Sequence, residues 1–118
     1  MAGGPTAPSV LLNEEFVVAP GDTVQIEDTS QRVRSVWVIS DSRCPIDVVC
    51  IHAGDAIVRI DILWSRRSES FDLHTADRHP VVDGRLTITL VRFNSSPVSS
   101  QTIAPDEYRA TLRATLQG

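Results

Sequence analysis

The sequence contains no lysine and no long apolar run, and each absence narrows the class of protein. All 11 basic residues are arginine. Codon bias in a GC-rich genome is one explanation, and a need for bidentate, permanently charged contacts is the other. No apolar run approaches the ~18–20 residues of a membrane-spanning helix, so we expect no transmembrane segment. With 42% apolar and 22% charged residues, collagen-like, coiled-coil and fully disordered chains are excluded.

Several motifs of catalysis and cofactor binding are also missing. There is no GxGxxG or GxxxxGK[ST] loop for a nucleotide, no GxSxG turn for a nucleophilic serine and no EF-hand spacing for calcium. The net charge of −4 argues against nucleic-acid binding, which usually requires a basic face. We therefore expect no cofactor, no nucleic-acid partner and no enzymatic activity.

What the sequence does contain is the pattern of one small β-domain, since 118 residues suffice for a single core. Residues 56–64 alternate, with one face entirely apolar and Arg59 and Asp61 on the other. Successive side chains of a strand point to opposite faces, so this pattern predicts a half-buried strand. The same rule places Trp64 in the core.

Two further segments alternate in the same way. Residues 108–116 place their apolar side chains on one face and Arg and Thr on the other. In residues 85–93 the rule places Phe93 on the face of Thr87 and Thr89, opposite the leucines and isoleucine. Additional strands, two of them weaker candidates, are predicted at 15–18, 23–27, 33–39 and 69–73.

These strands are separated by turn signals and not by amphipathic helices, which predicts an antiparallel sheet structure. We expect a β-sandwich of about seven or eight strands with Greek-key connections and one short disulfide-closed loop. Residues 1–13 are small and Pro-rich at their start and are expected to form a flexible tether. Residues 14–118 are expected to form the single domain.

Two cysteines, Cys44 and Cys50, lie close together in the sequence. Their spacing is not that of a CxxC motif, and no second pair completes a zinc site. A structural disulfide is the preferred interpretation, with two free thiols in a reducing compartment as the alternative. No signal peptide is visible. The disulfide and the tether together predict an exported protein, whether periplasmic, secreted or held at the cell surface by a lipid anchor.

The segment 44–54 interrupts the strand pattern, with Pro45 early and Gly54 late. Proline suits the first turn of a helix and glycine its C-terminal end. We expect an irregular connection that contains one helical turn and is closed by the disulfide.

The stretch Asp41-Ser-Arg-Cys-Pro45, a short gap, Cys50 and then Ala-Gly54 resembles a family of small, secreted or lipid-anchored bacterial β-domains. The resemblance covers residues 14–116. Where that family has an aromatic residue two positions after the second cysteine, this sequence has His52. The resemblance implies a β-fold and export, and it implies no established activity.

Two roles are open for this motif. In the structural one, Asp41 accepts backbone N–H groups and Arg43 forms a bidentate pair with Asp41, Asp47 or Asp55, so that the motif fastens a corner between strands. In the other, the rigid loop presents Arg43, His52 and Asp55 as a recognition surface. The structural role is preferred, with Asp41, Arg43, Pro45 and Gly54 as its residues.

Two other groups are candidates for binding. Trp37 alternates with its valine neighbours, so it either packs in the sheet or marks an exposed contact patch. His74, Asp77 and His79 include two imidazoles and a carboxylate, but their spacing in a polar loop is a weak metal signal. We expect them to form a solvated loop and no metal site.

The favoured function is therefore a non-enzymatic, exported binding or accessory domain with an unidentified protein or envelope component as its partner. The first alternative is a structural module of a larger envelope assembly, contacting it through a sheet edge or Trp37. The second is a small metal-dependent or hydrolytic enzyme, which would need titratable groups within hydrogen-bond reach in a cleft.

Overall fold

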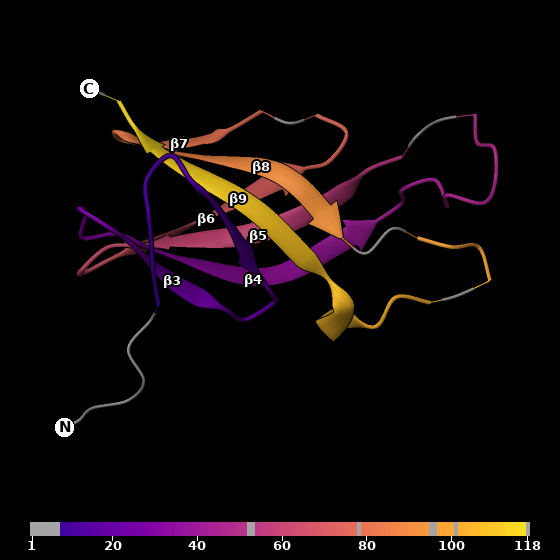
Figure 1. The fold of residues 1–118 in the computed structure, drawn as a ribbon, viewed down its shortest axis with the longest axis horizontal. Helices are drawn as coiled ribbons and strands as arrows, with labels where there is room; N and C mark the ends of the chain where they lie inside the picture. The colour runs from indigo at the N-terminus through magenta and orange to yellow at the C-terminus, as the bar shows by residue number, and fades with distance from the viewer. Residues whose placement is uncertain (1–7, 52–53, 78, 95–96, 101, 118) are drawn as a thin grey trace.

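The computed structural model describes residues 8–51, 54–77, 79–94, 97–100 and 102–117. Their strands form two sheets (Figure 1). The five-stranded sheet has the order β1-β3-β4-β5-β6, with β1 at Ser9–Val10, β3 at Thr23–Ile26, β4 at Arg32–Asp41, β5 at Ala56–Leu63 and β6 at Ser68–His74. The four-stranded sheet has the order β2-β9-β8-β7, with β2 at Glu15–Val18, β7 at Val81–Asp83, β8 at Leu86–Asn94 and β9 at Arg109–Leu116.

The two sheets enclose one apolar core. Fully buried side chains come from both sheets, among them Ile26, Val33, Val58, Ile60, Ile62, Leu73, Leu86, Ile88, Leu90 and Leu112. The predicted apolar faces of 56–64 and 108–116 are confirmed. On the opposite faces Arg59 is partly exposed, but Asp61 and Thr111 are buried, Asp61 beneath hydrogen bonds from Arg34 and Ser70. Trp64 packs partly buried against this core, and its indole N–H donates to the Asp83 carboxylate at 3.0 Å.

A β-bulge corrects the prediction for Phe93. The register between β8 and β9 shifts between Leu90 and Arg92, so that Arg92 pairs with Thr111 and Phe93 with the buried Ala110. The extra residue reverses the alternation, because a bulge places two residues opposite one. Phe93 therefore lies on the core side and packs against the core, not beside the threonines.

The domain begins earlier than the sequence indicated. Ser9–Val10, expected in the tether, pair in parallel with β3. The structure has nine strands in its described residues, because β1 and the short β7 add to the predicted set. The one helical element there is the 3-10 turn η1 at Pro105–Glu107. Within the same ranges, no helix has the length and hydropathy that a bilayer crossing needs.

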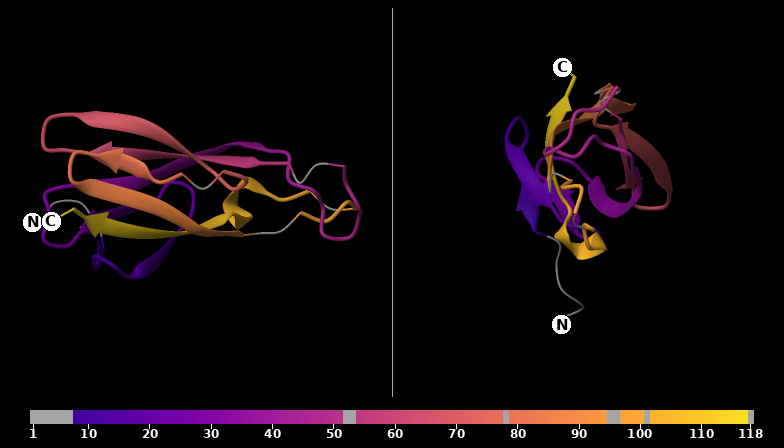
Figure 2. Two further views of the ribbon diagram at one scale, coloured as in Figure 1. Left: turned by 90° about the horizontal axis from the view of Figure 1, so that it is seen from above. Right: turned by 90° about the vertical axis from the view of Figure 1, so that its right-hand side faces the viewer.

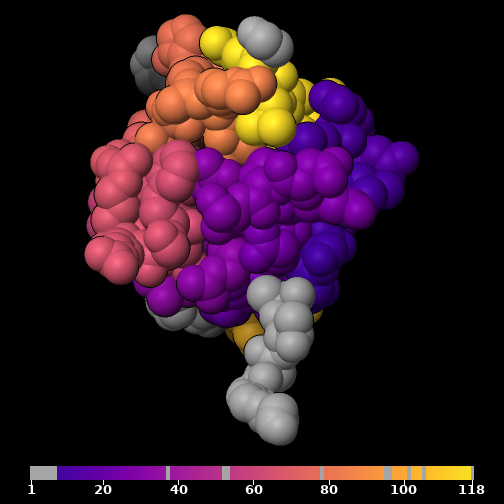
Figure 3. Space-filling model, turned by 90° about the vertical axis from the view of Figure 1, so that its left-hand side faces the viewer, coloured from indigo at the N-terminus to yellow at the C-terminus, as the bar shows by residue number. Residues whose placement is uncertain are grey.

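The molecule is elongated, with principal extents of 49 × 34 × 23 Å. The connections β4–β5 and β8–β9 project together beyond one end of the sheets (Figure 2). Both ends of the described chain lie toward the opposite end. There the turns β3–β4, β5–β6 and β7–β8 pack side by side and close the end of the molecule (Figure 3). The projecting end is thus the one built from long irregular connections.

Candidate functional site

The disulfide predicted between Cys44 and Cys50 is confirmed, with their Cα atoms 6.0 Å apart. The expected helical turn inside the ring is not formed. The chain makes a single turn there, in which the Val48 N–H donates to the Pro45 carbonyl at 3.3 Å. A ring this short has too few residues to continue the turn into a helix.

Residues 97–100 form hydrogen bonds with the disulfide ring. The Ile46 N–H donates to the Pro97 carbonyl at 2.9 Å. The Asp47 carboxylate accepts the Ser99 N–H at 2.9 Å and the Ser99 hydroxyl. These bonds from Ser99 hold the pKa of Asp47 below its ordinary value. We call residues 44–51 together with residues 97–100 the tip.

The tip exposes a cluster of aliphatic side chains. Val49 is fully exposed, Ile51 is 96% exposed, Ile46 72% and Val48 43%. They are half of the eight large apolar side chains that lie exposed in the described chain. Exposed aliphatics scattered singly are ordinary, but four of them within six consecutive residues of a projecting loop are typical of an interaction site. The ring cannot bury them, because it is too small to have a core of its own.

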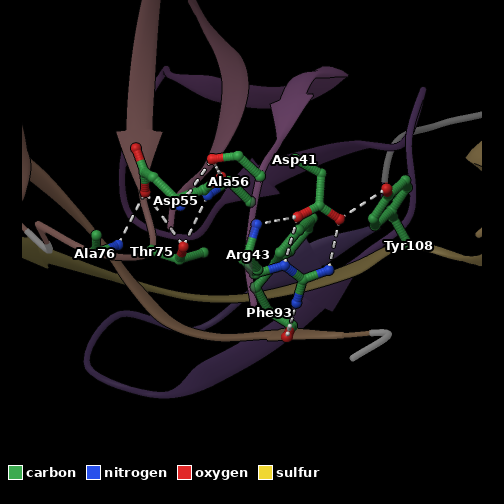
Figure 4. Close-up of polar contacts among 9 residues, drawn as sticks. Asp41, Arg43, Asp55, Ala56, Thr75, Ala76, Phe93 and Tyr108 are labelled. Atoms are coloured by element: carbon green, nitrogen blue, oxygen red, sulfur yellow. Dashed lines mark hydrogen bonds and ion pairs between the residues drawn. The ribbon is translucent and has the colours of Figure 1, made fainter. Parts of the chain in front are cut away.

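The tip is fastened to the sheets through an ion pair at its base (Figure 4). Arg43 and Asp41 form a two-pronged pair, with Nε to Oδ1 and Nη2 to Oδ2 both at 2.8 Å. Their side chains are only 13% and 12% exposed. Of the three carboxylates considered for Arg43, the structure thus selects Asp41, at the end of β4.

Two aromatic residues complete this arrangement, Phe93 on β8 of the other sheet and Tyr108 directly before β9. The Arg43 guanidinium lies 4.8 Å from the ring centre of Phe93, and its Nη1 donates to the Phe93 carbonyl at 3.5 Å. The rings of Phe93 and Tyr108 stack 5.2 Å apart, and the Tyr108 hydroxyl donates to Asp41 at 2.9 Å. Asp41, Arg43, Phe93 and Tyr108, which we call the clasp, therefore join the two sheets below the tip.

Electrostatics within the clasp follow from these contacts. Burial opposes the charge of Asp41, but the hydrogen bonds from Arg43 and Tyr108 outweigh it and hold the pKa of this carboxyl below its ordinary 3.8. For Tyr108, burial and the neighbouring Asp41 carboxylate both raise the pKa above its ordinary 10.0. The clasp thus favours an ionised carboxylate and a neutral phenol.

Asp55 belongs to a separate network at the other side of the tip's base. Its carboxylate accepts the Ala76 N–H at 2.9 Å and the Thr75 hydroxyl at 3.2 Å, and it contacts His74 Nδ1 at 2.5 Å. Burial opposes its charge, but the bonds from Ala76, His74 and Thr75 prevail and lower the pKa of Asp55. Asp55 thus ties the start of β5 to the end of β6.

Gly54 allows the two chain segments at the base of the loop to lie close together, and it does not cap a helix. Its φ is +74°, and a Cβ at this position would lie 1.8 Å from the carbonyl oxygen of Ser42. Ser42 and Asp55 bond each other here, with the Ser42 N–H donating to the Asp55 carbonyl at 2.7 Å. Only glycine permits this approach of the two chain segments.

The described residues of the predicted recognition surface, Arg43 and Asp55, do not share one network. Arg43 and Asp55 belong to different networks, Arg43 in the clasp and Asp55 with His74. His52 and the side chain of Trp37 lie outside the described residues.

The metal candidates are also separated by their contacts. His74 contacts Asp55, whereas His79 contacts the exposed Asp77 at 2.9 Å. Across the described part of the chain, no three His, Cys, Asp or Glu side chains are grouped to hold a metal ion.

The sequence interpretation missed the exposed aliphatics of the tip and the parts played by Phe93 and Tyr108. A usable signal for the tip was present, namely four β-branched residues in and beside a ring too short to bury them. For Phe93 and Tyr108 no local signal exists, because their contacts span about 50 to 67 positions. Comparison with protein-family models, curated proteins and solved structures finds no match for this chain.

Proposed function

We propose that the protein is an exported, non-enzymatic binding or accessory domain that inserts the aliphatic tip into an apolar groove of a partner protein. The observation that carries this proposal is the exposure of Ile46, Val48, Val49 and Ile51 on one projecting loop that the disulfide cross-links. Aliphatic side chains held in place by a disulfide lose little conformational freedom on binding, which favours affinity.

The finer description of the fold is part of the same proposal. We take the two sheets as a β-sandwich with a Greek-key connection. In support, β7, β8 and β9 follow one another as neighbours, and β2 lies beside β9 after a long excursion of the chain through the other sheet. This order matches a Greek key read from its last strand.

Export is supported by the disulfide, because such bonds persist in oxidising compartments. The resemblance to secreted or lipid-anchored bacterial β-domains agrees with it. A tether at the N-terminal end would leave the tip at the far end of the molecule, where a partner can reach it (Figure 2).

Four carboxyl groups serve to hold the loops and strands in place. Four described aspartates have a pKa lowered from the ordinary value, Asp41, Asp47, Asp55 and Asp61. Each accepts hydrogen bonds that fasten loops or strands.

A protein groove fits the tip better than a bilayer does. The ring is irregular, and its backbone groups would lose their water in hydrocarbon without gaining partners. The described tip also carries no cation for anionic headgroups, since its one charged side chain is Asp47. A folded groove supplies hydrogen-bond partners as well as apolar contact.

The test is site-specific photo-cross-linking in cells of the source organism. We expect a photoreactive phenylalanine in place of Val49 to give a discrete adduct with one protein on irradiation. The same probe at Val82, which is 53% exposed on β7, is the matched control and should give none.

A second substitution distinguishes specific docking from proximity. Ile51→Asp should abolish the adduct from position 49 while leaving the denaturation midpoint unchanged, because the side chain is exposed. Equal adducts from positions 49 and 82 would contradict the proposal. So would sedimentation of the wild-type protein with phosphatidylcholine–phosphatidylglycerol vesicles that Ile51→Asp abolishes, since that result would assign the tip to a membrane.

A further inference from the structure

The outer face of the four-stranded sheet is positively charged, although the protein is acidic. Neither β8 nor β9 contains an aspartate or glutamate. Their outward positions, together with the residue before β8, carry Arg85, Thr87, Thr89, Arg92, Arg109, Arg113 and Thr115, whereas Thr111 on the same side is buried. We call these seven accessible residues the arginine face. This sheet lies in front in Figure 1, so the arginine face is turned toward the viewer.

A single glutamate on the neighbouring strand binds two of the arginines on this face. Glu15 on β2 accepts hydrogen bonds from Arg92 Nη2 with one oxygen and from Arg113 Nη2, at 3.0 Å, with the other. Two guanidinium groups thus share one carboxylate, which leaves a surplus positive charge between them. Arg92 remains 58% and Arg113 42% exposed.

The guanidinium groups of Arg92 and Arg113 also keep N–H donors that Glu15 does not use. Arg113 Nε is buried and has no hydrogen-bond partner among the described residues. Each guanidinium has five N–H donors, and the bonds to Glu15 use one nitrogen of each. Because Nε is buried, a bound anion would use the exposed Nη donors of Arg92 and Arg113.

We propose that the arginine face binds an acidic polysaccharide, a sugar chain carrying carboxylate, sulfate or phosphate groups. Guanidinium groups bind such anions through paired hydrogen bonds. Neighbouring strands lie ~4.8 Å apart and alternate residues of one strand ~6.8 Å apart, so the arginines form an extended flat array that suits a linear polymer. The threonine hydroxyls between them can donate to and accept from sugar hydroxyls.

A nucleic acid fits this face less well. Single-stranded nucleic acids are held by aromatic side chains on which bases stack. The outward positions of β8 and β9 contain no aromatic residue, because the bulge turns Phe93 to the core side.

The test compares probes of the same backbone with and without charge. Binding of the full chain to dextran sulfate, polygalacturonate, neutral dextran and duplex DNA is measured by calorimetry at low ionic strength, about 50 mM. We expect affinity for both acidic glycans and none for neutral dextran. The double variant Arg92→Gln/Arg113→Gln should bind the acidic glycans at least tenfold more weakly.

Two further variants distinguish specific binding from a general effect of charge and from a failure to fold. Arg32→Gln/Arg59→Gln removes the same charge from the outer face of the other sheet and should change the affinity less than twofold. Glu15→Gln removes the carboxylate that competes for Arg92 and Arg113, and should bind the acidic glycans at least threefold more tightly. A gain in binding cannot come from a failure to fold.

Three results would overturn the proposal. They are equal losses in the two double variants, unchanged or weaker binding by Glu15→Gln, and binding of DNA as tight as that of the acidic glycans. This inference does not depend on the proposed role of the tip, because the arginine face and the tip share no residue. A failed cross-link at position 49 and a failed glycan titration are therefore separate outcomes.

Discussion

Arg43 and Tyr108 donate hydrogen bonds to the same oxygen, Oδ2 of Asp41, at 2.8 and 2.9 Å. One donor lies beside Asp41 in the sequence and the other 67 positions away. Both charges are largely withdrawn from water, and each finds its partner within the clasp. Such a group is stable when complete and costly when one member is removed.

The first prediction concerns that cost. Arg43→Ala should lower the free energy of unfolding by about 3 kcal/mol, because it leaves Asp41 charged and mostly buried. Arg43→Lys should restore only part of it, since lysine cannot form the planar two-pronged contact. Urea denaturation at neutral pH measures both. The control is Arg59→Ala, whose pair with Asp72 is exposed and should contribute about 0–1 kcal/mol. If Arg43→Ala unfolds like the wild type, the clasp does not stabilise the fold.

The second prediction follows from the lowered pKa of Asp41. The folded state favours the ionised carboxylate more than the unfolded chain does, so its stabilisation is complete above the ordinary 3.8 and is lost as pH falls through the folded pKa. The free-energy difference between the wild type and Asp41→Asn should therefore be largest near neutral pH and shrink as the pH drops below about 4. Comparing the two proteins removes the contributions of the other aspartates. A difference that stays constant down to pH 3 would refute this account.

The third prediction concerns the disulfide. Thiol titration of the unfolded, unreduced protein should detect no free thiol. Reduction should lower the free energy of unfolding by only about 2 kcal/mol, because the bond closes a short loop of the unfolded chain. The variant Cys44→Ser/Cys50→Ser should reproduce that loss without added reductant. Two free thiols in the isolated protein would remove both the ring and the support it gives to export.

The fourth prediction separates close packing from backbone strain. Gly54 and Gly84 have similar positive φ values, +74° and +63°, but a Cβ would meet Ser42 at Gly54 and open space at Gly84. Gly84→Ala should cost about 1–2 kcal/mol, the strain of a left-handed residue with a side chain. Gly54→Ala should cost at least twice as much, because it also forces Ser42 and Asp55 apart. Equal midpoints of thermal unfolding for the two variants would contradict the contact.

The sequence predicted the structure where local alternation determines which residues form a strand and which face each side chain occupies. The strand at 56–64 and its apolar core face were predicted because a half-buried strand imposes period two on its residues. The pairing of the cysteines was predictable for a similar reason, since a short spacing leaves few alternatives.

Prediction failed where the position of a side chain depends on one inserted residue or on a contact with a distant part of the chain. The bulge before Arg92 shifts the alternation by one and moves Phe93 to the core side, and nothing in the local sequence marks it. The meeting of Tyr108 with Asp41 and the parallel pairing of β1 with β3 depend on how the sheets are assembled. Alternation describes one strand at a time and carries no information on which strands become neighbours.

The pairing of β2 with β9 sets an order of events during synthesis. Glu15 to Val18 leave the ribosome early, whereas their partners Ala110 to Arg113 follow almost a hundred residues later. Until then Phe16 and Val18 have no strand beside them, while β3 to β6 can already pair as consecutive hairpins. The four-stranded sheet therefore closes last, and a nascent chain halted before β9 would expose an unpaired apolar strand to chaperones and proteases.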